Sequence, residues 1–207
     1  MAGLRPSTSR AALERRRRIV DAVRGLLRER TLDDISAADV AAAAEVSPAT
    51  VYNLVGTRDT LIVAMLEQSV GTVLAGLPPV DPQRPVDAVV DLVDRIATEL
   101  RADPIANRRA IAAMGSAGAD GWLDTSLGDL IEDRLAACPA ALDGRSTTSH
   151  TARMMHFGLR GVLVSWSYGH VTDDELGVVL VDVVLRLFST SASNDVAAAI
   201  RDRLPAA

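Results

Sequence analysis

Short polar side chains gather on one compact stretch of the sequence, SPATVYNLVGTRDTL at residues 47–61. Ser47 is a typical N-cap residue and Pro48 suits the first helical position, so the stretch predicts a helix that begins here and ends at Gly56. Asn and Thr side chains can hydrogen-bond the edges of DNA bases, and short side chains let the backbone approach them. The outward residues of this predicted helix are Ser47, Ala49, Thr50, Tyr52 and Asn53.

The same region offers groups that could bind phosphate. Free backbone N–H groups at a helix start, together with the positive end of the helix dipole, favour an anion. Three such starts are expected, near Ser36, Ser47 and Thr57. Arg58 would stand in the first turn of its helix, where the dipole disfavours a cation. This small loss of helix stability favours a role for Arg58 in binding phosphate.

These groups need a scaffold, and the flanking sequence predicts one. From Arg15 to about Arg30, apolar residues recur on one helix face. Ser36 and Asp39 then form a capping box at the start of a helix over 37–44. This helix, a short turn and the helix from Pro48 match a helix-turn-helix, whose second helix enters the DNA major groove. An ordinary helical hairpin with its polar residues facing water is the alternative. The residues expected to face inward are Ile19, Val20, Val23, Leu26, Leu27, Val40, Ala41, Ala44, Val51, Leu54, Val55, Leu61, Ala64 and Met65.

Composition restricts the class of protein. The 207 residues are 48% hydrophobic but only 3% aromatic, so the core must be aliphatic, and the abundance of Ala favours helices. The net charge is −5, yet residues 1–30 carry nine Arg against three acids. A basic end on an acidic body indicates a polyanion partner at that end, although a solvated tail is the alternative. The chain has no Lys, which excludes Schiff-base chemistry and a lysine phosphate loop.

Other kinds of site find little support in the sequence. No apolar run approaches the roughly 18 residues of a membrane span, and Cys138 is the single cysteine, so we expect no membrane association and a cytoplasmic protein. His150, His156 and His170 are spaced too widely to share a helix face as a ligand pair, and surface histidines explain them better. We therefore expect no metal, no cofactor and no enzymatic activity.

The ordered combination of these motifs resembles a known family. Residues 15–66, RRRRIVDAVRGLLRERTLDDISAADVAAAAEVSPATVYNLVGTRDTLIVAML, are similar to the DNA-binding region of TetR-family transcriptional repressors. The resemblance implies that Tyr52 contacts a phosphate, that Thr50 and its neighbours lie in the groove, and that Arg58 takes the position of a phosphate-binding lysine. The full set of expected DNA contacts is Ser36, Ser47, Pro48, Ala49, Thr50, Tyr52, Asn53, Thr57 and Arg58.

The chain also departs from the family pattern. Glu45 replaces a common glycine in the turn, so the turn is expected to manage without easy access to positive φ. Leu54 stands where a histidine or tyrosine often faces DNA, which leaves the preferred DNA sequence unpredictable. Val55 replaces an aromatic residue, and the usual glycine after the first helix is missing at Arg30–Thr31.

The rest of the chain is expected to be helical as well. Four prolines lie in residues 76–85, and helical patterns then cover 86–101, 104–114, 122–137, 151–168 and 173–188. The predicted fold is all-α, with an N-terminal helix-turn-helix joined to a larger helical domain for ligand binding and dimerisation. We expect a flexible basic arm over 1–12, the DNA-binding domain over 13–66, the larger domain over 67–190 and a tail over 191–207. The tail is expected either to form a short helix around 196–204 or to fray.

Two helices near the C-terminus carry faces that suit a dimer. The first has small residues in helical register, and the second has a broad apolar stripe after a capping box at Thr172 and Glu175. Paired with their symmetry mates, they would form a four-helix bundle, as the resemblance implies; packing inside one subunit is the alternative. The expected interface residues are Gly158, Val162, Ser165, Leu176, Val179, Leu180, Val183 and Leu187.

The few large residues of the C-terminal part are candidates for a ligand pocket, although plain core packing is the alternative for each. Trp122 is the strongest candidate, because it follows a Gly-rich loop that could form an entrance. A mainly apolar ligand is expected. The complete set is Met114, Trp122, Leu123, Met154, Met155, Phe157 and Trp166.

Together these observations predict a homodimeric, ligand-responsive transcriptional regulator. It would repress by binding a near-palindromic double-stranded DNA operator, and a small effector would release it. A helical enzyme or small-molecule carrier whose N-terminal hairpin is only structural is the alternative.

Overall fold

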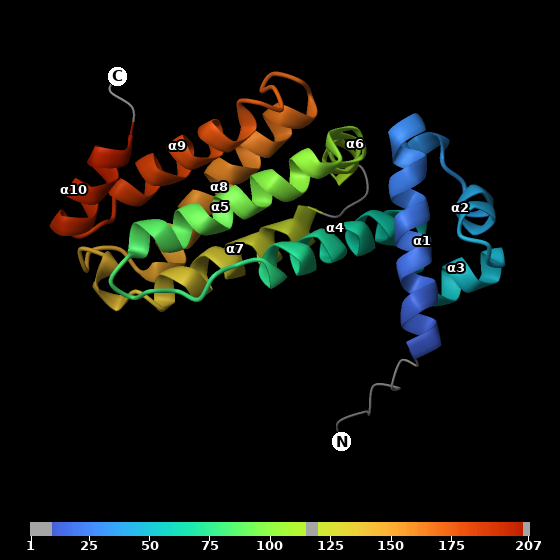
Figure 1. The fold of residues 1–207 in the computed structure, drawn as a ribbon, viewed down its shortest axis with the longest axis horizontal. Helices are drawn as coiled ribbons and strands as arrows, with labels where there is room; N and C mark the ends of the chain where they lie inside the picture. The colour runs from blue at the N-terminus through green and yellow to red at the C-terminus, as the bar shows by residue number, and fades with distance from the viewer. Residues whose placement is uncertain (1–9, 115–119, 205–207) are drawn as a thin grey trace.

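The computed structural model describes residues 10–114 and 120–204, without the side chains of Arg58 and of residues 120–126. Over these residues the chain is all-α, and the only bridge between extended residues joins Leu142 to Ala192. Figure 1 shows the arrangement of the helices. They are α1 (Arg10–Glu29), α2 (Ala37–Ala43), α3 (Pro48–Leu54), α4 (Arg58–Ala75), α5 (Pro85–Ala102), α6 (Pro104–Met114), α7 (Asp120–Ala136), α8 (Thr148–Ser167), α9 (Leu176–Ser189) and α10 (Asn194–Arg203), with short 3₁₀ turns at Leu32–Asp34 and Pro139–Ala141.

Local signals in the sequence set most helix starts. The predicted capping box at α2 is confirmed, since the Ser36 side chain accepts a hydrogen bond from the Asp39 N–H and Asp39 accepts one from the Ser36 N–H. Glu175 accepts hydrogen bonds from the N–H and the hydroxyl of Thr172, as the second capping box requires. The first regular turn of α9 then begins at Leu176.

Three segments differ from the sequence-based expectation. Helix α1 begins at Arg10, within the segment expected to be a flexible arm. The expected tail forms its short helix as α10, which begins two residues earlier than expected, packs against α5 and α9 and buries Val196 and Ile200. Helix α4 runs unbroken across the boundary expected between residues 66 and 67.

Helix α1 lies between two groups of helices (Figure 1). On one side it packs against α2 and α3, and on the other against α4 and α6. Helices α5, α7, α8 and α9 form the body, in which α8 contacts both α7 and α9. Because α4 extends from the side of α1 into the body, the two parts share one continuous element.

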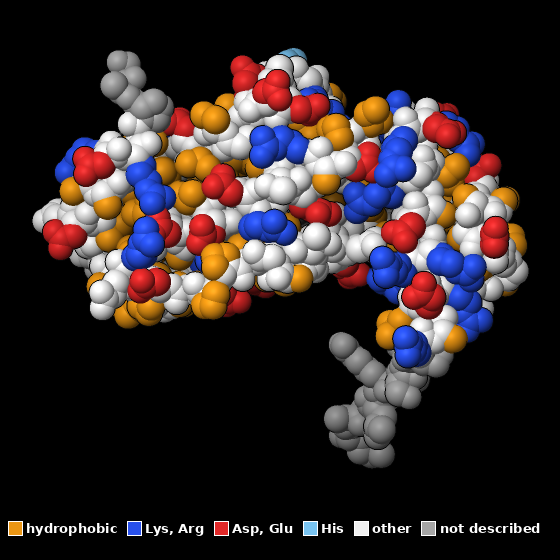
Figure 2. Space-filling view, in the orientation of Figure 1, with side chains coloured by type: hydrophobic (Ala, Val, Ile, Leu, Met, Phe, Trp, Pro, Cys, Tyr) orange, Lys and Arg blue, Asp and Glu red, His pale blue; other side chains and the backbone are white. Residues whose placement is uncertain are grey.

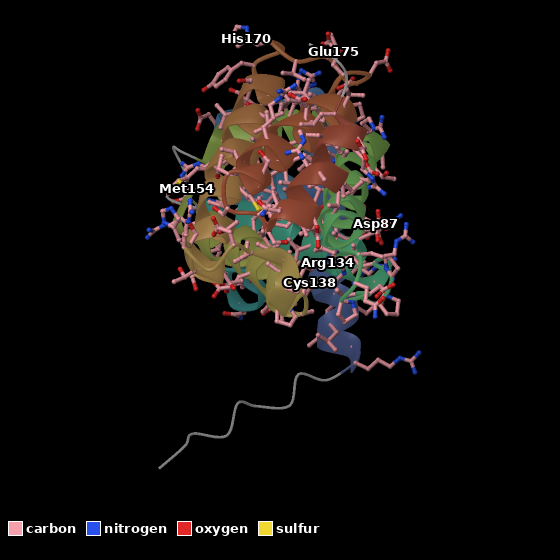
Figure 3. All side chains as sticks on the ribbon, turned by 90° about the vertical axis from the view of Figure 1, so that its left-hand side faces the viewer. Asp87, Arg134, Cys138, Met154, His170 and Glu175 are labelled. Atoms are coloured by element: carbon pink, nitrogen blue, oxygen red, sulfur yellow. The ribbon has the colours of Figure 1, made fainter. Side chains whose placement is uncertain are left out.

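The core is aliphatic, as the composition predicts, with Trp166 and Phe188 fully buried among Leu, Ile, Val, Met and Ala. A buried arginine also ties the 76–84 connection to α7. Arg134 donates hydrogen bonds to the carbonyls of Ala88 (2.6 Å) and Pro78 (3.3 Å), close to the buried Cys138 at the end of α7 (Figure 3). None of the described helices has the length and apolar character to cross a membrane.

Candidate nucleic-acid interface and ligand cavity

Helix α3 is short and docks through very little apolar surface. Val51 is its one fully buried residue, while Leu54 and Val55 are half-buried. The start of α3 is fixed by Ser47, whose hydroxyl accepts a hydrogen bond from the Thr50 N–H at 3.2 Å and lies 2.9 Å from the Thr50 hydroxyl. With one face anchored by Val51 and one end capped, α3 leaves the side chains of Ala49, Tyr52 and Asn53 exposed.

The predicted DNA-contacting residues of α3 do form an exposed surface. Tyr52 is 58% exposed, Asn53 and Ala49 are exposed, and Thr50 is half-buried. Ser36, Ser47, Pro48 and Thr57 are exposed as well. The Arg58 side chain lies outside the described residues.

The three helix starts are not equivalent donors. At α2, Asp39 already accepts a hydrogen bond from the Ser36 N–H at 2.8 Å, and its own N–H donates to the Ser36 hydroxyl. Hydrogen bonds from Ser36 hold the pKa of the Asp39 carboxyl below its usual range, so this carboxylate stays charged and would repel a phosphate. At α4, by contrast, Thr57 makes no side-chain cap, which corrects the expectation that its side chain caps the helix. Its start leaves more N–H groups free of side-chain partners.

The turn between α2 and α3 contains a strained residue. Glu45 has φ 53°, the left-handed conformation that glycine adopts most easily, so the expectation of a turn without positive φ is wrong. The Val46 N–H bonds the Ala41 carbonyl at 3.0 Å and the Glu45 N–H bonds that of Ala42 at 3.3 Å. This is the pattern of a Schellman motif, which places a left-handed residue at the Glu45 position whatever its side chain.

Basic side chains gather over the end of the molecule that holds α1, α2 and α3 (Figure 2). Several of them are already paired: Arg16 with Glu67 at 2.7 Å and Arg28 with Asp103 at 2.9 Å. Arg15 and Arg18 are exposed and form no ion pair with any described residue. Arg10, at the start of α1, is likewise exposed and without an ion pair to any described residue, so these three arginines are the ones on α1 best able to meet an anion.

A narrow apolar cavity of about 70 Å³ lies between α4, α5, α6, α7 and α8. Met114, one of the predicted ligand residues, lines it. The methylenes of Glu99 and the Ser69 side chain are its only contributions from polar residues. The lining residues are Leu66, Ser69, Val70, Val73, Ile96, Glu99, Leu100, Ile111, Met114, Leu127, Leu130 and Leu163.

Of the other predicted ligand residues, Met154, Met155, Phe157 and Trp166 are not among the described residues that line this cavity. Phe157 is 51% exposed on the outside of α8, so its assignment to a pocket is wrong. Met155 is buried in the core and Met154 is half-buried (Figure 3). Trp166 is buried with a structural role, because its Nε1 donates to Asp173 at 2.8 Å and the Arg108 guanidinium lies 4.7 Å from its ring. The side chains of Trp122 and Leu123 lie outside the described residues.

The expected dimer face needs correction, because part of it is buried inside the subunit. Leu176 and Leu180 are fully buried and Val162 nearly so, since these sides of α8 and α9 face the core. Gly158 brings α8 close to α9 of the same chain, where a Cβ would lie 2.4 Å from Leu187 Cδ1. The remaining expected interface residues, Ser165, Val179, Val183 and Leu187, are half-buried.

The exposed side of α8 instead carries an apolar stripe that the sequence reasoning missed. Phe157, Gly161, Val164 and Tyr168 recur at i, i+4, i+7 and i+11, and all four are exposed. Val178 on α9 is 69% exposed. We call Phe157, Gly161, Val164 and Tyr168 the α8 stripe. Its helical spacing was readable in the sequence, but only packing could tell it from the core-facing stripe.

The three histidines do not come together either. His150 and His170 are exposed, whereas His156 is buried, so the expectation of surface histidines is wrong for His156. Among the described residues, no group of His, Cys, Asp and Glu is arranged to hold a metal ion.

Comparison with known proteins gives relatives by structure alone. No family model and no curated protein matches the sequence. A TetR transcriptional regulator from Rhodococcus sp. RHA1 has a TM-score of 0.59 and 20% identity, covering 86% of this chain and 97% of its own. TylP, a TetR regulator from Streptomyces fradiae, has a TM-score of 0.60 and 20% identity, covering 95% and 92%. Thermus thermophilus FadR, a TetR-family repressor in complex with lauroyl-CoA, has a TM-score of 0.59 and 21% identity, covering 84% and 92%.

These similarities extend over most of both chains. At about one identical residue in five, they establish the architecture. The chain therefore has the fold of TetR-family transcriptional regulators.

Proposed function

We propose that this protein is a ligand-responsive DNA-binding transcriptional regulator. The observation that carries the proposal is the outer face of α3, where Tyr52, Asn53, Ala49 and Thr50 are accessible on a helix anchored by Val51. A helix that buries so little of itself is free to enter a major groove. The shared fold with TetR-family regulators supports the same function.

In this proposal α3 reads bases while its surroundings bind the DNA backbone. Asn53 and Thr50 offer hydrogen bonds to base edges, and Tyr52 donates its hydroxyl to a phosphate. The start of α4, which lacks a side-chain cap at Thr57, provides N–H groups for a second phosphate, and Arg58 adds a positive charge there. Arg15 and Arg18 add long-range attraction to the duplex.

We propose that the protein acts as a homodimer, through the α8 stripe rather than through the buried residues first expected. Phe157, Val164 and Tyr168 form an exposed apolar surface along α8, and Gly161 at its centre allows a second helix to approach closely. A twofold axis there would place two α3 helices on successive major grooves of a near-palindromic operator.

The effector in this proposal is a small, mainly apolar molecule that occupies the cavity beside Met114. The FadR structure shares this fold and was solved with lauroyl-CoA, a molecule with a long apolar chain. Binding of the effector would favour one arrangement of the two α3 helices, and binding of DNA would favour the other. The effector would therefore weaken DNA binding, and DNA would weaken effector binding. The protein would repress without effector and release DNA with it.

DNA binding is tested with the full chain and labelled duplexes from the DNA flanking its own gene, with fluorescence anisotropy over a range of salt concentrations. We expect binding that weakens steeply with salt. Tyr52→Ala and Arg58→Ala should weaken binding to all sequences, whereas Asn53→Ala should change the preference among duplexes. Thr98→Ala, an exposed change on α5, is the matched control. Absence of binding at low salt by the folded protein would favour the helical carrier or enzyme instead.

Dimerisation is tested with Val164→Arg, which places a charge in the α8 stripe. We expect the variant to be monomeric in light scattering and to lose DNA affinity. Ile105→Arg on α6 is the control, because Ile105 is an exposed apolar residue (53%, against 37% for Val164) outside the stripe. A dimeric Val164→Arg protein would refute this interface without affecting the assignment of α3.

A further inference from the structure

One arginine of α1 joins the DNA-binding end of the molecule to the wall of the apolar cavity. Arg24 donates from Nη1 to the Asn107 side-chain oxygen of α6 and from Nη2 to the Ser69 hydroxyl of α4, each at 3.1 Å. Asn107 is 1% exposed and Ser69 is 7% exposed. The half-buried Arg24 side chain thus bridges α4 and α6, and both of its acceptors are neutral.

Both acceptors belong to the cavity wall or are bonded to it. Ser69 lines the cavity itself. Asn107 donates from its side-chain nitrogen to the carbonyls of Leu100 (2.9 Å) and Glu99 (3.3 Å), and these two residues also line the cavity. One partner of Arg24, Ser69, would therefore touch an occupant of the cavity directly. The other partner, Asn107, is hydrogen-bonded to two residues that would touch it.

Other contacts of α1 with the body lack this property. Arg16 pairs with Glu67 on α4, and Arg28 pairs with Asp103 before α6, but neither partner lines the cavity. Arg109 of α6 donates to the carbonyl of Leu27 at 2.8 Å, where it caps the C-terminal end of α1. Through this hydrogen bond, a movement of α6 would carry the C-terminal end of α1 with it.

We infer that Arg24, Ser69 and Asn107 form the joint through which filling of the cavity changes DNA affinity; this rests on the proposed function. Because one planar guanidinium bonds α4 and α6 together, the joint keeps both bonds only at one separation of these helices. An occupant that moves Ser69 away from Asn107 breaks one bond. Helix α1 then shifts with its remaining partner and carries along α3, which packs against it. A packed interface with two discrete arrangements is the kind of element that transmits such coupling.

The joint can be tested without knowledge of the natural effector, because a larger side chain can fill the cavity. Leu130→Phe on α7 enlarges a lining residue that does not belong to the joint, and Val73→Phe on α4 is a second, independent filling change. Each is combined with Arg24→Met, which removes the guanidinium but keeps an apolar stem. Arg16→Met is the matched control, because it removes another bond between α1 and α4 that lies away from the cavity. DNA affinity is measured by anisotropy at one salt concentration, and folding by circular dichroism.

We expect the filling changes to weaken DNA binding at least about fivefold in the parent and in Arg16→Met, the lower end of ordinary allosteric coupling. In Arg24→Met the same changes should alter binding less than about twofold, since the bridge is already absent. Equal weakening in the Arg24→Met and Arg16→Met backgrounds would overturn the joint, as would no weakening by either filling change in the parent. If the unmodified chain binds no DNA, the proposed function itself fails, which the parent measurement reveals first.

Discussion

The strained turn at Glu45 leads to a prediction whose size follows from the backbone. At φ 53° an L-residue other than Gly, Asn or Asp carries about 1–2 kcal/mol of steric cost, which Gly avoids. Gly also raises the entropy of the unfolded chain, which opposes this gain by about 0.4–1 kcal/mol. The exposed Glu45 side chain forms no ion pair with the described residues, so little else is lost. Glu45→Gly should therefore stabilise the protein by about 0.5–1 kcal/mol.

For a chain of this length, such a gain raises the melting temperature by about 1–4 °C. The measurement is urea unfolding at one fixed protein concentration, because dimerisation would make stability depend on concentration. Glu45→Ala separates conformation from charge: it removes the same carboxylate but keeps the left-handed cost, so we expect almost no change. If Glu45→Gly unfolds at the same urea concentration as Glu45→Ala, the strain argument is wrong.

Three further predictions come from close packing and from carboxylates with lowered pKa. Gly158→Ala should destabilise the protein by about 1–3 kcal/mol, because its Cβ would overpack against Val183 and Leu187. Gly161→Ala on the same helix meets no atom within 4 Å and should stabilise a monomeric background such as Val164→Arg. Urea unfolding that ranks the two substitutions the other way would contradict the packing of α8 on α9. Asp173→Asn should destabilise the protein at neutral pH and alter Trp fluorescence, because the hydrogen bond from Arg108 holds the pKa of Asp173 below its usual value, with a smaller effect from Trp166. The stability that the charged Asp173 contributes is present above about pH 4 and is lost as the pH falls through the lower folded-state pKa. The difference in unfolding free energy from wild type should therefore shrink in acid. Ser36→Ala should lower the unfolding free energy by about 1 kcal/mol through loss of the cap. Because hydrogen bonds from Ser36 lower the pKa of Asp39, this loss of stability should also become smaller in acid. A loss that does not change with pH would count against the capping box.

The sequence predicted those parts of the fold that depend on neighbouring residues. Capping at Ser36, Ser47 and Thr172 was readable because these hydroxyls bond backbone groups three residues away. The exposed face of α3 followed from the spacing of Val51 and its neighbours. The all-α fold followed from the absence of any period-two pattern together with helical periodicity throughout.

Features that depend on distant contacts could not be read in the same way. Both sides of α9 are apolar, so the sequence could not tell that Leu176 and Leu180 face the core while Val178 faces outward. The positive φ of Glu45 came from the Schellman hydrogen bonds around it, which override the preference of the residue itself. Arg24 gave no signal at all, because its partners Ser69 and Asn107 lie 45 and 83 residues away.

The unbroken course of α4 has a consequence for anyone who wishes to exchange parts between regulators of this architecture. A cut after residue 66 would sever this helix in its middle. The same cut would remove α6, against which α1 packs. The part of the chain that holds α1, α2 and α3 thus depends on the rest of the chain for its packing. A chimera that transplants it has to carry all of α4 together with the surface of α6 that supports α1.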